Sequence, residues 1–152
     1  GGVTTVVDMP LNSIPSTVDV KSFEAKLRAV RKPRGKIFVD IAFWGGLVPQ
    51  NAHNATVLEE LLSKGVVGLK AFMSPAGTED FDQSSVNDIK AAAAILTKFN
   101  APLMVHAELP PQNDVLSSNG KDPRKYSTYM NSRPKKWEKV CLFFHFCSCV
   151  RK

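Results

Sequence analysis

Four short apolar runs recur along the chain at nearly constant intervals, and this spacing restricts the fold more than any other feature. The runs cover residues 3–9, 37–43, 66–72 and 102–107, and their starts lie 34, 29 and 36 residues apart. Runs that are apolar almost throughout are typical of strands buried on both faces of a parallel sheet. An interval of about 30 residues accommodates a strand, a crossover helix and two short loops.

Helical patterns fill the three gaps, because apolar residues recur there at spacings of three and four. The order β-α-β-α-β-α-β predicts an α/β fold with about four parallel strands and three right-handed crossover helices. A doubly wound open sheet and an arc of a (β/α)8 barrel both fit this order, and periodicity does not separate them. The residues predicted to begin or end the helices are Ser16 with Asp19, Asn54, Gly65, and Ser85 with Asp88.

The last third of the chain has a different character. Residues 109–136 are polar and rich in proline and glycine, which predicts a long loop. Residues 133–138 resemble the start of another helix. Residues 139–152 show neither a helical stripe nor strand alternation, and we expect them to be a tail outside the fold, disordered or wrongly assigned to this chain.

Charge and cysteine content argue against several functional classes. The net charge is +6, but residues 1–120 hold 11 basic against 12 acidic side chains, so the excess lies after residue 120. This distribution fits a solvated tail better than a nucleic-acid-binding face. The three cysteines, Cys141, Cys147 and Cys149, form no disulfide framework, and their spacing with His145 matches no common zinc module. No apolar run reaches the ~20 residues of a membrane span. Because the cysteines form no disulfide framework, a soluble, reduced compartment is the default expectation.

Polar residues that end the apolar runs are the candidates for chemistry, since active sites of parallel α/β folds collect at the carboxyl ends of strands. Asp8 ends the first run, Trp44-Gly45-Gly46 follows the second, Lys70 lies late in the third, and His106 with Glu108 ends the fourth. Asp8 is expected to hydrogen-bond a loop. The glycines suit a tight loop near a ligand, and His53 is expected at the surface or as a cap.

Lys70 and His106 each allow two interpretations. A lysine within an apolar strand is costly unless it is paired or neutral. Lys70 is therefore either a structural lysine paired with a carboxylate such as Glu108, or a reactive or modified lysine. His106 is either a hydrogen-bonded core histidine or a metal ligand, which Glu108 could orient from outside the ligand shell.

Several longer motifs resemble the allantoinases, especially the plant type, in the cyclic amidohydrolase group. They are GGVTTVVDMPLNSIPST, VDIAFWGGLVPQN, GVVGLKAFMSPAGTEDF and PLMVHAE, in this order, and the resemblance covers about residues 1–138. It implies a (β/α)8 barrel whose second to fifth strands lie in this chain. It also implies two divalent metal ions, with zinc expected, bound by Lys70 after carboxylation by carbon dioxide and by His106. The reaction implied is opening of the hydantoin ring of allantoin to allantoate.

The motifs also leave gaps, which point to an incomplete barrel. A His-x-His pair, a later histidine and a late aspartate are further metal-site residues of the family, and none has a counterpart here. We therefore expect an incomplete fragment that is inactive alone. Two alternatives remain, a dihydropyrimidinase or hydantoinase, and a non-catalytic truncated product or small flavodoxin-like binding module. Family members are often homo-oligomers, and plant members suggest the endoplasmic reticulum as a possible compartment. Neither a nucleic acid nor a membrane is expected as a partner.

Overall fold

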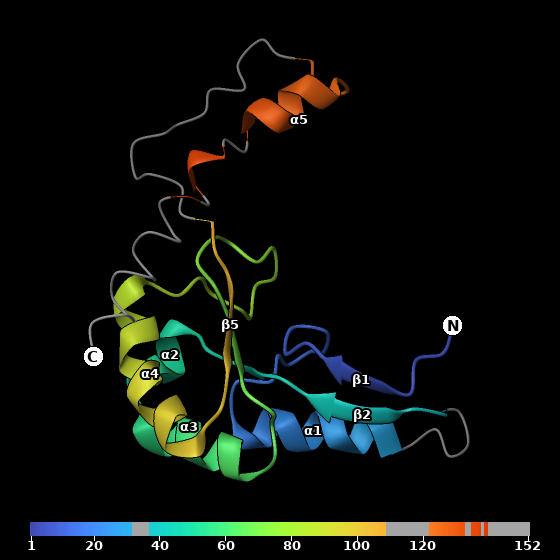
Figure 1. The fold of residues 1–152 in the computed structure, drawn as a ribbon, viewed down its shortest axis with the longest axis vertical. Coiled ribbons are helices and arrows are strands. Elements are labelled where there is room, and N and C mark those ends of the chain that lie inside the picture. Colours follow the sequence, from blue (N-terminus) through green and yellow to red (C-terminus); the bar gives the residue numbers. More distant parts are fainter. Residues whose placement is uncertain (32–36, 109–121, 133–134, 138, 140–152) are drawn as a thin grey trace. The chain divides into compact units, whose positions relative to one another are not determined.

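The chain divides into two compact units, Gly1–His106 and Ala107–Lys152. The computed structural model describes residues 1–31, 37–108, 122–132, 135–137 and 139 (Figure 1). Residues 109–121 of the loop predicted at 109–136 lie outside the described residues, as do the three cysteines and nearly all of the predicted tail. The domain boundary expected at residue 138 falls within the second unit and stays a prediction.

The strands of the first unit are short, and every pairing between them is parallel. All four predicted runs contain strands, although each strand is shorter than its run. The strands are β1 (Thr5–Asp8), β2 (Asp40–Phe43), β3 (Gly45–Gly46), β4 (Leu69–Phe72) and β5 (Leu103–His106). The β1 strand pairs with β2, while β3, β4 and β5 form a second sheet in that order.

The second apolar run contains β2, and a further short strand, β3, follows it after Trp44. Before this residue the run pairs with β1, and the amide of Trp44 still donates to the carbonyl of Asp8 at 2.9 Å. After it, the amide of Gly45 donates to Gly68 at 2.9 Å, and β3 continues along β4. The strand predicted within residues 37–43 is therefore confirmed as β2, whereas β3 was not predicted.

The order of the strands distinguishes the two architectures that the sequence left open. Strands that are neighbours in space follow one another in the chain, from β1 through β2 and β3 to β4 and β5. This sequential order is that of a (β/α)8 barrel, whereas in a doubly wound sheet a later strand returns to lie on the other side of the first strand. Three helices, α1 (Val20–Arg31), α3 (Ala55–Ser63) and α4 (Val86–Phe99), lie along one side of these strands (Figure 1).

The first helix, α1 (Val20–Arg31), begins with a different cap from the predicted one. The side chain of Asp19 accepts a hydrogen bond from the amide of Ser22 at 2.7 Å, and Ser22 Oγ accepts one from the amide of Asp19 at 3.1 Å. The expected pair of Ser16 and Asp19 is wrong by one turn. Ser16 instead lies in the preceding loop, where its amide donates to Asp80 Oδ2 at 2.6 Å.

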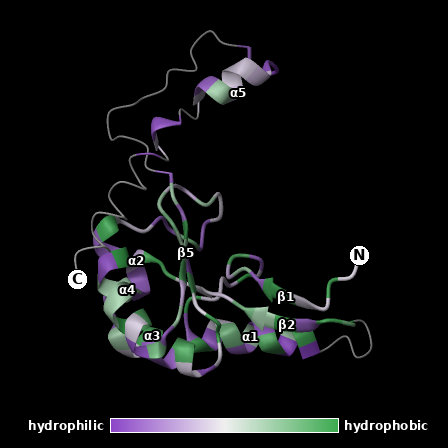
Figure 2. Cartoon of the chain, in the orientation of Figure 1, coloured by the Kyte–Doolittle hydropathy of each residue, from purple (hydrophilic) through white to green (hydrophobic). Residues whose placement is uncertain are grey.

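The other helix ends follow the sequence more closely. Asn54 caps α3 (Ala55–Ser63), accepting from the amide of Val57, and Gly65 follows that helix at a φ of 106°. Ser85 and Asp88 form the predicted capping box of α4 (Val86–Phe99). A short helix, α2 (Pro49–Ala52), precedes α3 and was not predicted. Figure 2 shows hydrophobic and hydrophilic residues alternating along α1, α3 and α4, as expected for helices with one apolar side.

Burial of the strands is uneven, which corrects the expectation of strands covered on both faces. The middle strand β4 is buried at three of its four positions, whereas β1 is exposed at three and β5 alternates. Leu69 and Ala71 are fully buried, while Val6 and Val7 remain about 40% exposed, at 39% and 41%. A strand in the middle of the arc has a neighbouring strand on each edge and helices on one face. Among the described residues, β1 has a neighbouring strand on one edge only.

The second unit contains the helix α5 (Tyr126–Ser132), within the segment predicted as loop. Its sequence, YSTYMNS, has no apolar stripe, so periodicity gives no helical signal there. The helix predicted to start at 133–138 is borne out locally, since the amide of Lys139 donates to the carbonyl of Lys135 at 3.3 Å.

The close approach of β4 and β5 gives a stability prediction. A Cβ on Gly68 would collide with the carbonyl oxygen of Pro102 and lie 2.6 Å from the ring of Trp44. Gly68→Ala should therefore lower the free energy of unfolding by about 2 kcal/mol or more, the upper range for overpacking. The urea midpoint measures this loss. Gly1→Ala is the control, since nothing lies within 4 Å of its Cβ position, and equal midpoints for both variants would contradict the prediction.

Candidate functional site

Lys70 and His106 lie on the same face of adjacent strands. In the register of β4 and β5, Lys70 pairs with Met104 and Phe72 pairs with His106. Side chains of paired residues point to the same face, and alternate residues along a strand share that face. The two predicted site residues therefore project from the face opposite Leu69 and Ala71, which are buried in the core.

Lys70 is buried without a charged partner among the described residues. Its relative exposure is 8%, and its Nζ forms no ion pair or hydrogen bond with any part of the chain that the structure describes. Burial lowers the pKa of the Lys70 amine from its ordinary value. The cause is the free-energy cost of removing an ammonium ion from water without a counter-charge, which destabilises the charged form relative to the neutral one.

An aromatic ring connects the two residues. The Nζ of Lys70 lies 4.6 Å from the centroid of the Phe72 ring. The imidazole of His106 stacks on the same side chain, with 5.0 Å between centroids and 17° between planes. Phe81, from the loop between β4 and α4, contacts Phe72 edge-on at 5.7 Å. The structure thus places Lys70 and His106 around one aromatic side chain at the carboxyl end of β4.

Asp8, another strand-end candidate, is directed away from this face. Its Oδ2 accepts from the Nζ of Lys26 at 2.8 Å, and its Oδ1 accepts from Asn12 at 3.0 Å. Burial raises the pKa of Asp8, but these hydrogen bonds and the Lys26 charge outweigh burial and lower it overall. Asp8 holds the loop after β1, as expected for its structural interpretation.

Lys26 of α1 is the structural residue that sequence reasoning missed. It is 5% exposed, and its Nζ also donates to the carbonyl of Met9 at 2.8 Å. Helical spacing contains the signal, because Lys26 lies three residues after the buried Phe23. A polar residue on the apolar face of a helix is a candidate for a buried ion pair.

The remaining candidates have other roles or stay untested. Gly45 and Gly46 form β3 instead of a loop, and a Cβ on Gly46 would lie 2.6 Å from the Phe81 ring, so this glycine serves packing. His53 is exposed and contacts Asp88 at 2.8 Å, which agrees with a surface role. Glu108 belongs to the second unit, so its expected pairing with Lys70 or His106 stays a prediction.

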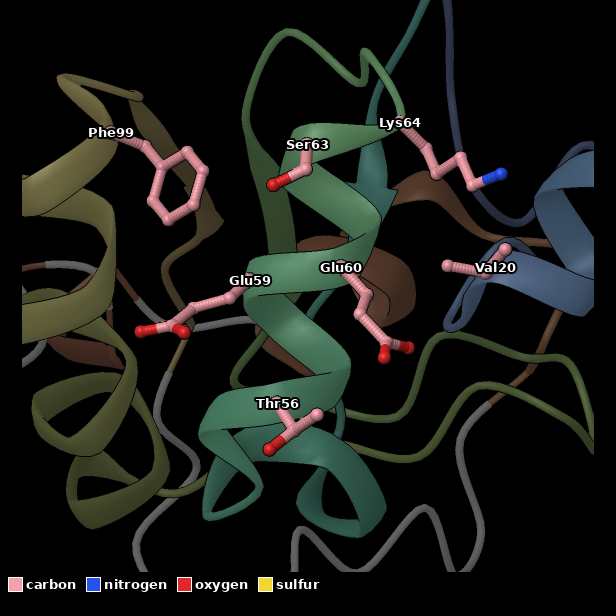
Figure 3. Close-up of a pocket in the computed structure, with 7 residues that line it drawn as sticks. All are labelled: Val20, Thr56, Glu59, Glu60, Ser63, Lys64 and Phe99. Carbon is pink, nitrogen blue, oxygen red and sulfur yellow. The ribbon is translucent and has the colours of Figure 1, made fainter.

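The other described residues offer little that competes with this face as a site. They contain no group of three or more His, Cys, Asp or Glu side chains able to hold a metal ion. Among them, no helix is long and apolar enough to cross a membrane. A surface pocket of about 560 Å³ lies on the helical side, where Val20 of α1 and Phe99 of α4 flank α3 (Figure 3). Its lining contains no histidine or cysteine, and it lies away from the strand ends.

Comparison with known proteins identifies relatives along almost the whole chain. No family model matches. The allantoinase of Arabidopsis thaliana is 47% identical over 142 residues, which cover 93% of this chain and 28% of that protein. The allantoinase of Saccharomyces cerevisiae is 41% identical over 138 residues, covering 91% and 29%. The chain is homologous to allantoinases.

Solved structures agree with this homology. The L-hydantoinase (dihydropyrimidinase) of Arthrobacter aurescens matches 95% of this chain and 31% of its own, with a TM-score of 0.77 and 25% identity. A dihydroorotase of Campylobacter jejuni matches with a TM-score of 0.55 and 20% identity, a likeness of fold alone. The chain thus spans less than a third of the length of the allantoinases that it matches.

The ion pair of Asp8 and Lys26 gives a pH-dependent prediction. Asp8→Asn should lower the free energy of unfolding at pH 7 by about 1.5–3 kcal/mol, the range for hydrogen bonds to charged groups. The pKa of Asp8 is lowered by folding, so its ionised form stabilises the chain above about pH 4, and this stabilisation is lost as pH falls through the folded pKa. The difference between wild type and variant should therefore shrink at acid pH.

Urea midpoints at pH 7 and pH 3 measure this difference. Asp40→Asn is the matched control, because Asp40 is exposed and has no ion pair among the described residues. An Asp8→Asn effect that is equal at both pH values would contradict the assigned ion pair.

Proposed function

We propose that this chain is part of an allantoinase-type hydrolase, with Lys70 and His106 as two ligands of its metal centre. The observation that carries the proposal is the buried amine of Lys70, which has no anionic partner among the described residues and shares a strand face with His106. Homology to allantoinases over 93% of the chain supports allantoin as the substrate. The sequential parallel strands support an arc of a (β/α)8 barrel.

Lys70 would act as a metal ligand after carboxylation. The lone pair of its neutral Nζ forms a bond to the carbon of carbon dioxide, one C–O π bond becomes the carboxylate, and a proton leaves Nζ for water. Burial lowers the pKa of Lys70, which increases the neutral fraction that can react. The product is an anion, and an anion suits a site that binds divalent cations.

The donor types fit such a centre, although they form only part of one. A carboxylated lysine supplies oxygen ligands, and the imidazole of His106 supplies nitrogen, a combination that zinc accepts. When bound, the metal ions would activate water and polarise the amide carbonyl of the ring. The residues of this chain would hold the ions, exclude water on the side of the buried core and support the loops at the strand ends.

A hydantoinase is the second candidate function. It is favoured by the likeness to the L-hydantoinase structure, which covers 95% of this chain. The identity to that protein is 25%, against 47% for the Arabidopsis allantoinase, so the allantoinase proposal is preferred. Either function would open a cyclic amide, and we propose the same two ligands, Lys70 and His106, for both.

A chimera tests the proposed function directly. Residues 1–138 would replace the homologous segment of the Arabidopsis allantoinase, and allantoin hydrolysis would be measured. The chimera should be active, and Lys70→Ala or His106→Ala should lower activity by at least about 100-fold, since even residues that only support a metal ligand contribute 10- to 100-fold. Lys90→Ala, an exposed lysine of α4, is the matched control and should leave activity unchanged. Full activity of Lys70→Ala would exclude the proposed ligand.

The isolated chain should behave differently from the chimera. We expect no allantoin turnover above that of its Lys70→Ala variant, because two ligands do not complete a metal centre. Purified chain, zinc and bicarbonate would be assayed together. Turnover by the wild-type chain that its Lys70→Ala variant lacks would show that this segment suffices for catalysis.

A further inference from the structure

We propose that Phe72 is a positioning residue that fixes the Lys70 side chain and the His106 imidazole in the directions needed to bind the same metal centre. This inference rests on the proposed function, because it takes both residues as ligands. Phe72 itself has no metal-binding atom. It would act through its ring, which contacts both side chains.

Lys70 depends on the ring because the described residues offer its amine no other partner. A lysine side chain has many rotamers, and fixing one of them costs conformational entropy. Lys26 is fixed by a carboxylate and a backbone carbonyl. The Nζ of Lys70 has instead the Phe72 ring at 4.6 Å. This contact places the end of the Lys70 side chain over the ring.

His106 depends on the ring for the orientation of its plane. The lone pair of an imidazole nitrogen lies in the plane of the ring, so the tilt of that plane sets the direction of a metal–nitrogen bond. Stacking on Phe72 within 17° of parallel restricts this tilt. His106 is exposed, and the stacked Phe72 ring covers one face of its imidazole.

Phe72 is in turn held by Phe81. The two rings meet edge-on, with centroids 5.7 Å apart and an angle of 81°, a favourable aromatic geometry. Phe81 is 1% exposed, and the absence of a Cβ on Gly46 makes room for its ring. A buried ring therefore supports the ring that contacts both ligands.

The first experiment uses the full chain and NMR. The Lys70 Cε protons and the His106 ring protons should be shifted upfield by the ring current of Phe72. Phe72→Leu and Phe72→Met, which keep an apolar side chain without a ring, should lose these shifts. Phe72→Tyr, which keeps an aromatic ring, should retain them. Phe99→Leu is the matched control, because Phe99 ends α4 and lines the pocket on the helical side (Figure 3). Unchanged shifts in Phe72→Leu or Phe72→Met would overturn the assigned contacts.

The second experiment measures zinc binding in the chimera. Phe72→Leu and Phe72→Met should raise the zinc concentration that half-fills the site by about ten-fold, as expected for residues that orient ligands. Phe72→Tyr should bind zinc as the parent chimera does. Unchanged zinc affinity in the ring-less variants would overturn the positioning role while leaving the proposed function intact. A parent chimera without zinc or activity would instead reject the proposed function, and the NMR shifts would still decide whether Phe72 fixes the two side chains.

Discussion

The change of hydrogen-bonding partner at Trp44 holds the strands of the first unit in one arc. The amide of Trp44 still bonds β1, while the carbonyl of Phe43 already accepts from Val67 in front of β4 at 2.9 Å. Backbone groups that are removed from water need such partners. The segment around Trp44 satisfies backbone groups on both neighbouring segments and so connects β1 to the sheet that carries Lys70, whereas β5 pairs with β4 directly.

Two buried lysines show how differently this fold treats the same side chain. Lys26 has a carboxylate at 2.8 Å and backbone carbonyls around its Nζ, which offsets the cost of burial and anchors a loop. Lys70, on the opposite side of the strands, has an aromatic ring and no anion among the described residues. A buried cation without an anion lowers the stability of the fold, so stability does not explain why a lysine lies there. This contrast is why a chemical role is proposed for Lys70, while Lys26 is assigned a structural one.

Sequence reasoning was most accurate where the signal is local. The caps at Asn54 and at Ser85 with Asp88, and the end of a helix at Gly65, depend on a few neighbouring residues and were confirmed. Burial of β1 was predicted wrongly, because burial depends on which elements cover a strand. The helix α5 was missed, since its polar sequence carries no period. Homology to allantoinases was recognised correctly from longer motifs.

The sequence by itself determined that strands and helices alternate, that the strands are parallel, and that Lys70 and His106 are candidate metal ligands. These follow from the spacing of apolar runs and from the chemical types at their ends. Only the tertiary structure decided that Phe72 lies between these two side chains and that Asp8 turns toward Lys26 instead. The reason is physical, because strand register and helix packing fix which side chains meet across segments distant in sequence, and no local pattern encodes that register.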